Sequence, residues 1–397
     1  MGFKDLFKKK EVADDNINVT EDKAEEKAEA VKAQEEKTEE ASEQKEEVKA
    51  EEKPPVQENA EPQQQAAPSK MIPDERKQEI AQMVFKKKIE ESDLESLNIQ
   101  ETIFLLVNVD HFHEESSEGV ENYEEKCEVI DRVLAKKLAD AEVLYMTFDA
   151  GTNFPYITQG CVEIYSELEY AQDAVRHYGE QYRPVQICEV RKDDSRFPDK
   201  MSIFEFLYYL GMEHLLIDNG KFKTVVNRED VMAIANKNPD YKLDKPIVNP
   251  KLRYALIEFF QEVKWPVTYE KREEVIHEKE DRMLDELKKA KFLVPMLFDG
   301  EEVTKAQNQV APQPGKNMIL PKLETQEHVC FTPIFTDWTE FVKIYPKDKW
   351  NGLVITFDEA TTLCKDMGIV INPAGENLIM NQQSFEALRS REENKNK

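Results

Sequence analysis

The pattern of apolar and polar positions after residue 73 predicts helices and strands in alternation. Apolar residues at helical spacing, from Ile80 through Met83 and Val84 to Ile89, predict a helix that begins near Pro73. Short apolar runs rich in β-branched residues predict strands; these are 102–109, 142–148, 185–190, 292–298, 329–335 and 353–355. Amphipathic or charged stretches and capping residues predict helices; these are 119–139, 269–290, and helices beginning at Ser166 (with Glu169 as capping-box partner), at Asn249-Pro250 and at Thr336-Asp337. The alternation predicts a mixed α/β fold, with mixed sheets flanked by helices.

One stretch of this pattern occurs twice. Residues 202–231 align with residues 356–385 at a constant offset of 154, without a gap. Both stretches begin with a capping box, Ser202 with Glu205 in the first and Thr356 with Glu359 in the second. Two predicted strands follow in each: 215–217 corresponds to 369–371, and 225–226 corresponds to 379–380. An earlier run, 164–167 against 334–337, recurs at a different offset. We therefore predict two copies of one architecture, the first with a longer insert.

Residues 1–70 differ in kind from the rest of the chain. Residues 11–70 consist mainly of Glu, Lys, Ala and Gln, and they contain no Leu and no aromatic residue. Such a segment buries too little apolar surface to offset its ordering entropy, so we predict a disordered acidic linker. In residues 1–10, by contrast, Phe3, Leu6 and Phe7 share a helical face and four lysines supply positive charge. This segment is either a short anchor, for weak docking to a membrane surface or a partner, or a disordered chain start.

Charge and composition exclude several classes of protein. The formal net charge is −27, of which about −8 falls within residues 1–70. An acidic surface repels phosphate backbones, so we expect no nucleic-acid partner. No apolar run reaches the roughly 18 residues of a membrane-spanning helix, and the N-terminus lacks the features of a signal peptide. The five cysteines are scattered and form no C-x-x-C pair, which favours buried or half-buried thiols in a reducing cytoplasm.

The C-terminal part of the chain resembles a known family. The motifs F-L-V-P, L-P-K-L, F-T-P-I-F-T-D-W and G-I-V-I-N-P-x-G-x-N-L are similar to the SseB N-terminal domain, and they contain Val294-Pro295, Leu320-Pro321, Pro333 to Asp337 and Gly368 through Leu378. The resemblance covers roughly residues 290–388. The upstream copy resembles it in diverged form, with Asp218-Asn219 where the family has Asn-Pro. The resemblance implies a cytoplasmic bacterial protein with a small α/β domain and no established enzymatic chemistry.

These patterns together divide the chain into five regions. They are a basic amphipathic segment (1–10), a disordered linker (11–70), a diverged SseB-like domain (101–265), a charged helical linker with coiled-coil character (266–289) and an SseB N-terminal-like domain (290–390). We therefore predict two tandem SseB-like domains behind a disordered acidic tail.

The tetrapeptide Asn372-Pro373-Ala374-Gly375 follows a predicted strand. Asn before Pro favours an extended backbone, and Gly375 tolerates a positive φ, so these residues predict a turn. Alternatively, Asn372 and Asn381 flank a polar pocket or a partner surface, with Asp218 and Asn227 as their upstream counterparts. Both interpretations stay open at this point.

Metal binding and catalysis find little support. His111 and His113 follow the predicted strand 102–109, where an extended backbone would place both on one side, as in a Zn²⁺ or Ni²⁺ site. No third ligand stands at a recognisable spacing, so we favour a solvated polar loop. The chain lacks the G-x-S-x-G, Walker A, G-x-G-x-x-G and H-E-x-x-H motifs. We predict no catalytic residue, no metal site and no cofactor.

The leading functional hypothesis is a non-enzymatic bacterial protein that binds a protein partner or a small regulator. One alternative is an enzyme or amino-acid-responsive factor that uses a ligand pocket between the two modules. Another is a structural or stress-related factor at the membrane surface, attached through residues 1–10.

Overall fold

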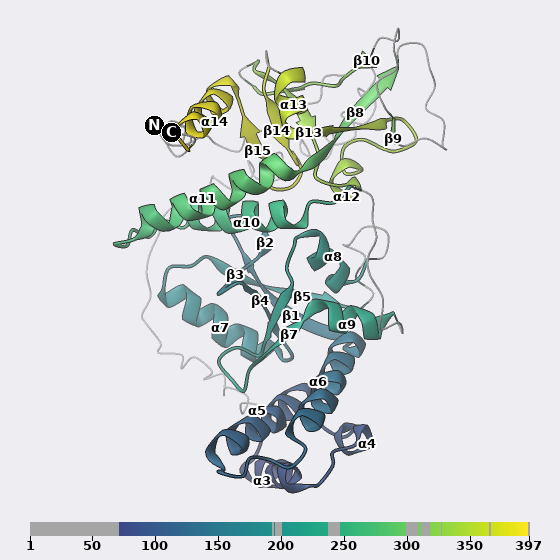
Figure 1. Ribbon diagram of the computed structural model, residues 1–397, viewed down its shortest axis with the longest axis vertical. Helices are drawn as coiled ribbons and strands as arrows, with labels where there is room; N and C mark the ends of the chain where they lie inside the picture. Colours follow the sequence, from purple (N-terminus) through teal and green to yellow (C-terminus); the bar gives the residue numbers. More distant parts are fainter. Residues whose placement is uncertain are drawn as a thin grey trace, which may run out of the picture.

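A computed structural model gives the fold of the chain (Figure 1). It describes residues 71–192, 194, 201–236, 247–298, 309–310, 318–326, 328–364 and 367–395. The predicted linker 11–70 and the segment 1–10 lie outside these residues, as does most of the loop 299–316. The predicted mixed α/β class is confirmed, because helices flank sheets that contain both parallel and antiparallel strand pairs.

The described chain begins with a helical region at the bottom of Figure 1. Its elements are α3 (Asp74–Gln82), η2 (Met83–Phe85), α4 (Glu91–Leu94), α5 (Ile99–Glu115) and α6 (Tyr123–Asp140). Pro73 is the N-cap of α3, as predicted. The single helical stripe predicted as far as Ile89 is wrong, because the helix gives way to a 3-10 turn at Met83 and Ile89 reaches the core from non-helical chain.

The strand predicted at 102–109 is also wrong, because these residues form the middle of α5. The run is apolar almost throughout, so its spacing shows neither a helical nor a strand period. Its apolar side chains divide between two cores: Ile103 packs under the first sheet, while Phe104, Leu105, Leu106 and Val109 pack among α3, α4 and α6. A helix buried on several sides needs no polar face, and this explains the misleading pattern.

The first sheet follows α6 and has strand order β5-β1-β4-β6-β7, with β2 and β3 as short additions. Its strands are β1 (Val143–Asp149), β2 (Phe154–Pro155), β3 (Ile157–Thr158), β4 (Cys161–Tyr165), β5 (Val185–Arg191), β6 (His214–Ile217) and β7 (Thr224–Asn227). The pair β4–β6 is parallel, whereas β1–β4, β1–β5 and β6–β7 are antiparallel. The accompanying helices are α7 (Leu168–Glu180), α8 (Ile203–Tyr209) and α9 (Arg228–Ala235).

The second set of strands lies at the top of Figure 1 and divides into two four-stranded sheets. Its strands are β8 (Lys291–Phe298), β9 (Gln309–Val310), β10 (Met318–Ile319), β11 (Leu323–Glu324), β12 (Cys330–Ile334), β13 (Asn351–Thr356), β14 (Ile369–Ile371) and β15 (Leu378–Met380). β13 pairs with β8, an isolated bridge joins Leu293 to Phe335 beside β12, β12–β14 is parallel and β14–β15 is antiparallel. The helices are α12 (Trp338–Phe341), α13 (Phe357–Leu363) and α14 (Gln382–Lys395).

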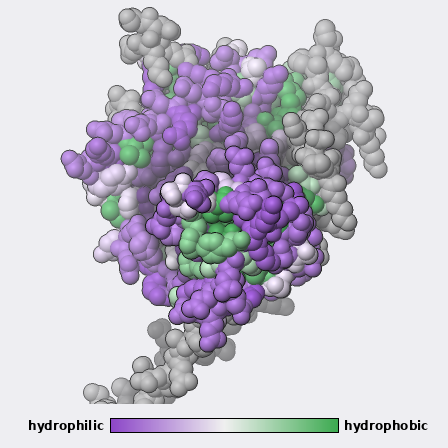
Figure 2. Space-filling model, turned by 60° about the horizontal axis from the view of Figure 1, so that its bottom comes forward, coloured by the Kyte–Doolittle hydropathy of each residue, from purple (hydrophilic) through white to green (hydrophobic). Residues whose placement is uncertain are grey.

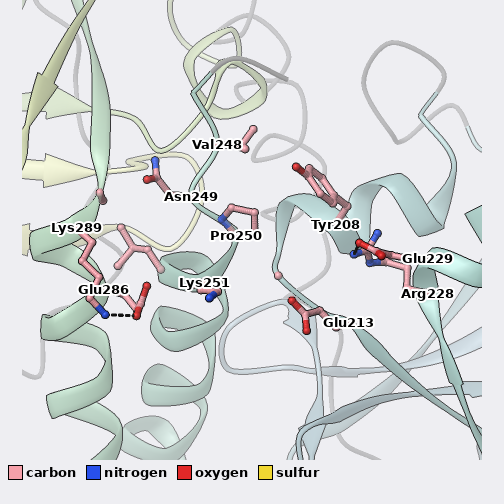
Figure 3. Close-up of a pocket in the computed structure, with 13 residues that line it drawn as sticks. Tyr208, Glu213, Arg228, Glu229, Val248, Asn249, Pro250, Lys251, Glu286 and Lys289 are labelled. Atoms are coloured by element: carbon pink, nitrogen blue, oxygen red, sulfur yellow. Dashed lines mark hydrogen bonds and ion pairs between the residues drawn. The ribbon is translucent and has the colours of Figure 1, made fainter. Parts of the chain in front are cut away.

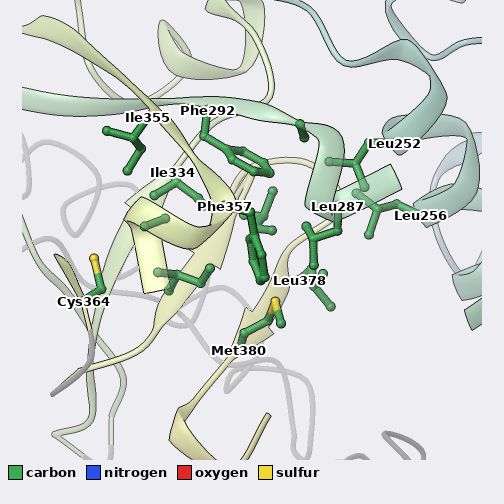
Figure 4. Close-up of a cluster of buried hydrophobic side chains, with 14 of the residues drawn as sticks. Leu252, Leu256, Leu287, Phe292, Ile334, Ile355, Phe357, Cys364, Leu378 and Met380 are labelled. Carbon is green, nitrogen blue, oxygen red and sulfur yellow. The ribbon is translucent and has the colours of Figure 1, made fainter. Parts of the chain in front are cut away.

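Two long helices, α10 (Pro250–Lys264) and α11 (Arg272–Lys289), pack side by side between the two sets of strands in Figure 1. Leu252, Leu256 and Phe259 of α10 and Met283 and Leu287 of α11 join one core with β8, β13 and β14 (Figure 4). Ile257 of α10, by contrast, packs in the core of the first sheet. α10 therefore contributes to both cores, and the division of the chain at 265/266 and 289/290 stays a prediction.

The predicted helix starts are confirmed in part. Ser202 with Glu205 and Thr356 with Glu359 form complete capping boxes, and Asp337 caps α12. The start predicted at Ser166 is wrong, because α7 begins at Leu168 and the Ser166 hydroxyl instead donates to Asp218 at 2.8 Å.

Candidate functional site

Asp218 and Asn372, two of the predicted site residues, occupy the same place in the two sheets. Asp218 directly follows β6, and Asn372 directly follows β14. Each is fully buried and has a left-handed backbone, with φ of 50° and 49° respectively. The backbone N–H of Asp218 donates to Ile164, and that of Asn372 donates to Ile334. The side-chain Oδ1 then accepts from the next strand end, from Ser166 at 2.7 Å and from Thr336 at 3.0 Å. Short polar side chains suit a left-handed residue that must satisfy a neighbouring N–H.

The turn predicted at Asn372-Pro373-Ala374-Gly375 is confirmed, but its left-handed residues are Asn372 and Asn377 rather than Gly375. Gly375 is required for another reason. A Cβ at this position would lie 2.8 Å from a carboxylate oxygen of Glu340, so the turn packs directly on that side chain.

The structure does not bring the members of each predicted pair together. Asn372 and Asn381 lie at opposite ends of the β14–β15 hairpin, whose register pairs Ile371 with Leu378 and Ile369 with Met380. Asp218 and Asn227 lie at opposite ends of the β6–β7 hairpin in the same way. Asn381 and Asn227 are exposed and lead into α14 and α9. Whether any of the four binds a ligand or partner stays a prediction.

Asn372 belongs to a buried charge network centred on Arg253 of α10. The guanidinium contacts Glu376 at 2.6 Å, Glu340 at 2.7 Å and Asp337 at 3.4 Å, and all four side chains are almost fully buried. The Asn372 amide donates to the second oxygen of Glu376 at 2.8 Å. Lys343 adds a contact to Glu340 at 2.8 Å from the half-exposed side. Because Arg253 lies on α10 and its partners lie on α12 and the β14–β15 turn, the network joins that helix to the second set of strands.

The electrostatics of this network favour the charged guanidinium. Burial opposes the charge of Arg253, but the three carboxylates outweigh it and raise the pKa above its usual value. Burial also raises the pKa of Glu340, although Arg253 acts in the opposite direction. Among the described residues, the network contains three carboxylates but only two cations. Hydrogen bonds to the carboxylate oxygens, such as that from Asn372, therefore offset part of the cost of burying the charges.

A different polar cluster surrounds Asp218 at the end of β6. Asp218 accepts from Ser166 and, at 2.9 Å, from the amide of Gln100 on α5. Burial raises the pKa of Asp218 to about 6, against the lowering effect of these hydrogen bonds. Nearby, buried Glu163 accepts from Tyr178 at 2.7 Å and from Asn219 at 2.6 Å. Within the described part of the chain, neither carboxylate forms an ion pair with Lys or Arg.

A pocket of about 310 Å³ lies where the two modules meet (Figure 3). Tyr208, Glu213, Arg228 and Glu229 line one side, and the start of α10 with Glu286 and Lys289 of α11 lines the other. Arg228 is almost fully buried; its Nε donates to the carbonyl of Met212 at 2.9 Å, and the nearest Glu229 oxygen is 3.9 Å from Nη2. Burial lowers the pKa of Arg228. The pocket therefore presents cations and carboxylates together.

The sequence did not identify Arg253, Glu376, Glu163 or Arg228 as site residues. The one available signal was Arg253, a charged residue next to Leu252 and one helical turn before Leu256 and Ile257 on the apolar side of α10. Its partners lie 84 to 123 residues further along the chain, so no local spacing connects them.

The histidine geometry assumed from the sequence is wrong. His111 and His113 lie on α5, where residues two apart point about 200° apart around the axis. His111 lies 3.4 Å from Glu115, whereas the His113 ring accepts from the backbone of Val120 at 3.1 Å and stacks on Tyr123. Among the described residues, no group of three or more His, Cys, Asp or Glu side chains is arranged to hold a metal ion.

None of the five cysteines, all of which the structure describes, forms a disulfide; four are half-buried and Cys364 is buried, as predicted. None of the helices that the structure describes is both long and apolar enough to cross a membrane.

Comparison with known proteins agrees with the resemblance found in the C-terminal part. Residues 270–382 match the family described as SseB protein N-terminal domain, so the C-terminal part of the chain is similar to that domain. The match begins before α11 and ends at the start of α14, so it contains the helix that we had predicted to be a linker. No curated protein and no solved structure matched the chain.

Proposed function

We propose that the chain is a non-enzymatic, cytoplasmic bacterial protein that binds a protein partner through a tandem of two SseB-type units. The observation that carries this proposal is an exposed apolar area on the N-terminal helices. The Phe85 ring is 71% exposed and makes an edge contact, 5.2 Å between ring centroids, with the half-buried Phe112. Half-buried Met83 packs on the same core. We call Met83, Phe85 and Phe112 the Phe85 patch.

Figure 2 supports a docking role for this region, because it shows an apolar area surrounded by hydrophilic residues on the face formed by the N-terminal helices. Apolar patches with a polar rim are typical of protein–protein contacts. A large aromatic ring held by a second ring also loses little conformational freedom on binding, which suits it as an anchor residue.

The proposed tandem rests on hydrogen-bond geometry that the two halves share. Tyr145 of β1 pairs with Tyr165 and Glu189, and Leu293 of β8 pairs in the same way with Phe335 and Val354. Ala141 and Ala290 end the helix before each of these strands, and each donates to the carbonyl three residues earlier. The shared scheme also includes the left-handed residues Asp218 and Asn372. A helix pair, α5–α6 or α10–α11, precedes each sheet, so the proposed repeat is larger than the 30 residues visible in the sequence.

The partner proposal is tested by affinity purification of the full chain from its native host. We expect Phe85→Ser to lose at least one protein that the unchanged chain retains. Tyr182→Ser is the matched control, because Tyr182 is 74% exposed and lies outside the patch. Equal partner sets for the two variants and the unchanged chain would contradict the proposal.

A second candidate function is that of an amino-acid-responsive factor, and the junction pocket in Figure 3 favours it. Its mixture of Arg228, lysines and glutamates suits a zwitterion, which offers one carboxylate and one ammonium group. The test is thermal unfolding of the full chain with each free amino acid at millimolar concentration. Binding to the folded state raises the midpoint, and Arg228→Met would abolish that rise. No rise with any amino acid would exclude this candidate.

A further inference from the structure

A groove of about 610 Å³ runs between α6, β7 and α9, and it shares no lining residue with the Phe85 patch or the junction pocket. Its apolar floor consists of Ala135, Val226, Ala233 and Ile234. Val225, on the strand β7, is 53% exposed beside it. Within the described chain β7 pairs with β6 alone, so it is the edge of its sheet. An exposed β-branched residue on an edge strand is a feature that proteins usually cover.

The rim of this groove is acidic. Glu128, Asp131 and Asp230 line it, and none of the three forms an ion pair with a described Lys or Arg side chain. The one cation on the rim, Arg132, pairs with Glu91 of α4 at 2.9 Å. Partial loss of hydration raises the pKa of Asp131, and the carboxylates Asp110 and Asp230 raise it further. The rim therefore holds uncompensated negative charge, and a cation placed on it would lower the electrostatic energy.

We infer that this groove is the docking site for residues 1–10 of the same chain. The segment complements the groove in both respects. Phe3, Leu6 and Phe7 stand at the i, i+3, i+4 spacing with which a helix fills an apolar groove. Lys4, Lys8, Lys9 and Lys10 against the single Asp5 give it a net charge of about +3, opposite to that of the rim.

The length of the intervening chain allows this contact. Sixty residues, 11–70, separate the segment from the first described residue. The disordered linker that the sequence predicts for these residues would span about 43 Å on average, more than a contact within one domain requires. The described chain that follows begins in the same helical region as one wall of the groove, because Ile72 belongs to the same core as Val129 and Val133 of α6. Tethering then holds the segment at an effective concentration of the order of millimolar, so a weak contact suffices to occupy the groove.

Self-docking of this kind covers an edge strand that the described chain leaves exposed. The contact of residues 1–10 with the acidic rim weakens at high salt, since exposed charge pairs weaken as ionic strength rises. The acidic linker does not compete for the rim, because its own net charge is negative.

Hydrogen–deuterium exchange of the full chain, followed by mass spectrometry at low salt, tests the proposal. In the unchanged chain we expect residues 224–234 to exchange about three- to tenfold more slowly than in the variant Lys8→Glu/Lys9→Glu/Lys10→Glu or in Phe3→Ser/Phe7→Ser. The matched control is Lys23→Glu/Lys27→Glu/Lys32→Glu, which makes the same charge change within the linker and should keep the slow exchange. Adding Glu128→Lys/Asp131→Lys to the triple variant at 8–10 should restore protection.

Three outcomes would overturn the proposal. The first is equal exchange of 224–234 in all variants. The second is protection that shifts to 99–115, which would place the segment on the Phe85 patch. The third is binding of the full chain to vesicles containing about 30% anionic lipid, lost in the variants of residues 1–10, with no change at the groove; residues 1–10 would then be a membrane anchor.

Discussion

At the residue scale, Asp218 and Asn372 have the same backbone geometry but different hydrogen-bond partners. Asp218 and Asn372 share a left-handed backbone and one hydrogen bond to the neighbouring strand end, so either side chain satisfies the local geometry. Their surroundings decide the difference. Asn372 donates to Glu376, which a carboxylate in its place could not do. Asp218 instead accepts from Ser166 and Gln100, so a second acceptor oxygen is useful there even though its charge is buried.

The buried charge of Asp218 gives a prediction about pH. Its pKa is raised by burial to about 6, so the folded state binds this proton more tightly than the unfolded state does. The stabilisation is present below about pH 4 and is lost as the pH rises through 6, at a cost of about 3 kcal/mol. Asp218→Asn should remove this dependence and raise stability at pH 7 by about 1 kcal/mol, because the poorer contact with Gln100 offsets part of the gain.

Urea unfolding between pH 4 and pH 7, followed by tryptophan fluorescence, measures this effect. Asp348→Asn is the control, because Asp348 is exposed. If the Asp218 variant keeps the pH slope of the unchanged protein, the buried charge is not its cause.

Arg253 gives a second prediction at this scale. Arg253→Met should lower the free energy of unfolding by about 3–5 kcal/mol, because three buried carboxylates lose their guanidinium. Arg282→Met is the matched control: its half-exposed guanidinium contacts only Glu258 among the described carboxylates, and its loss should cost less than about 1 kcal/mol. Thermal unfolding of the two variants side by side checks this. Equal losses would show that the network adds nothing beyond a surface ion pair.

At the scale of elements, capping residues and apolar runs each predicted most of their elements, and each failed at one place, Ser166 and 102–109 respectively. The capping boxes at Ser202 and Thr356 depend on residues three apart, and the sequence shows them directly. α5 has the same signal, Asn98 with Glu101, but its apolar interior suggested a strand. The hydrogen bonds of a cap are local, whereas burial of α5 between two cores depends on chain that comes later. Neither signal is sufficient alone, because the capping box predicted at Ser166 with Glu169 does not form either.

This comparison predicts matched effects of three substitutions. Asn98→Ala, Ser202→Ala and Thr356→Ala should each lower stability by about 1 kcal/mol, because each removes a side-chain acceptor for an N–H of the first helical turn. Asn227→Ala should cost less, since Asn227 stands at the N-cap of α9 without making a capping hydrogen bond. Chemical denaturation measures all four. A loss for Asn227→Ala as large as the others would contradict the assignment.

At the scale of the whole molecule, the sequence predicted the mixed fold, the SseB-type domain and most strands, but it did not predict how the modules join. The apolar side chains of α10 divide between two cores, with Leu256 on one side and Ile257 on the other. Adjacent residues on a helix point about 100° apart, so the sequence shows only a broad apolar face. The same limit applies to Arg253, whose partners on α12 and the β14–β15 turn are known only once the fold brings them to α10.

Sharing of α10 predicts that the two modules unfold together. Leu256→Ala and Ile257→Ala each remove a fully buried side chain, one from each core, and each should cost about 2–5 kcal/mol. Because the helix cannot leave one core and stay in the other, each variant should speed hydrogen exchange in both β1 and β8 under conditions that favour exchange through global unfolding. Lys251→Ala, on the exposed side of the same helix, should leave both strands unchanged. Faster exchange in only the strand of the altered core would show that the modules are independent units and that α10 merely lies between them.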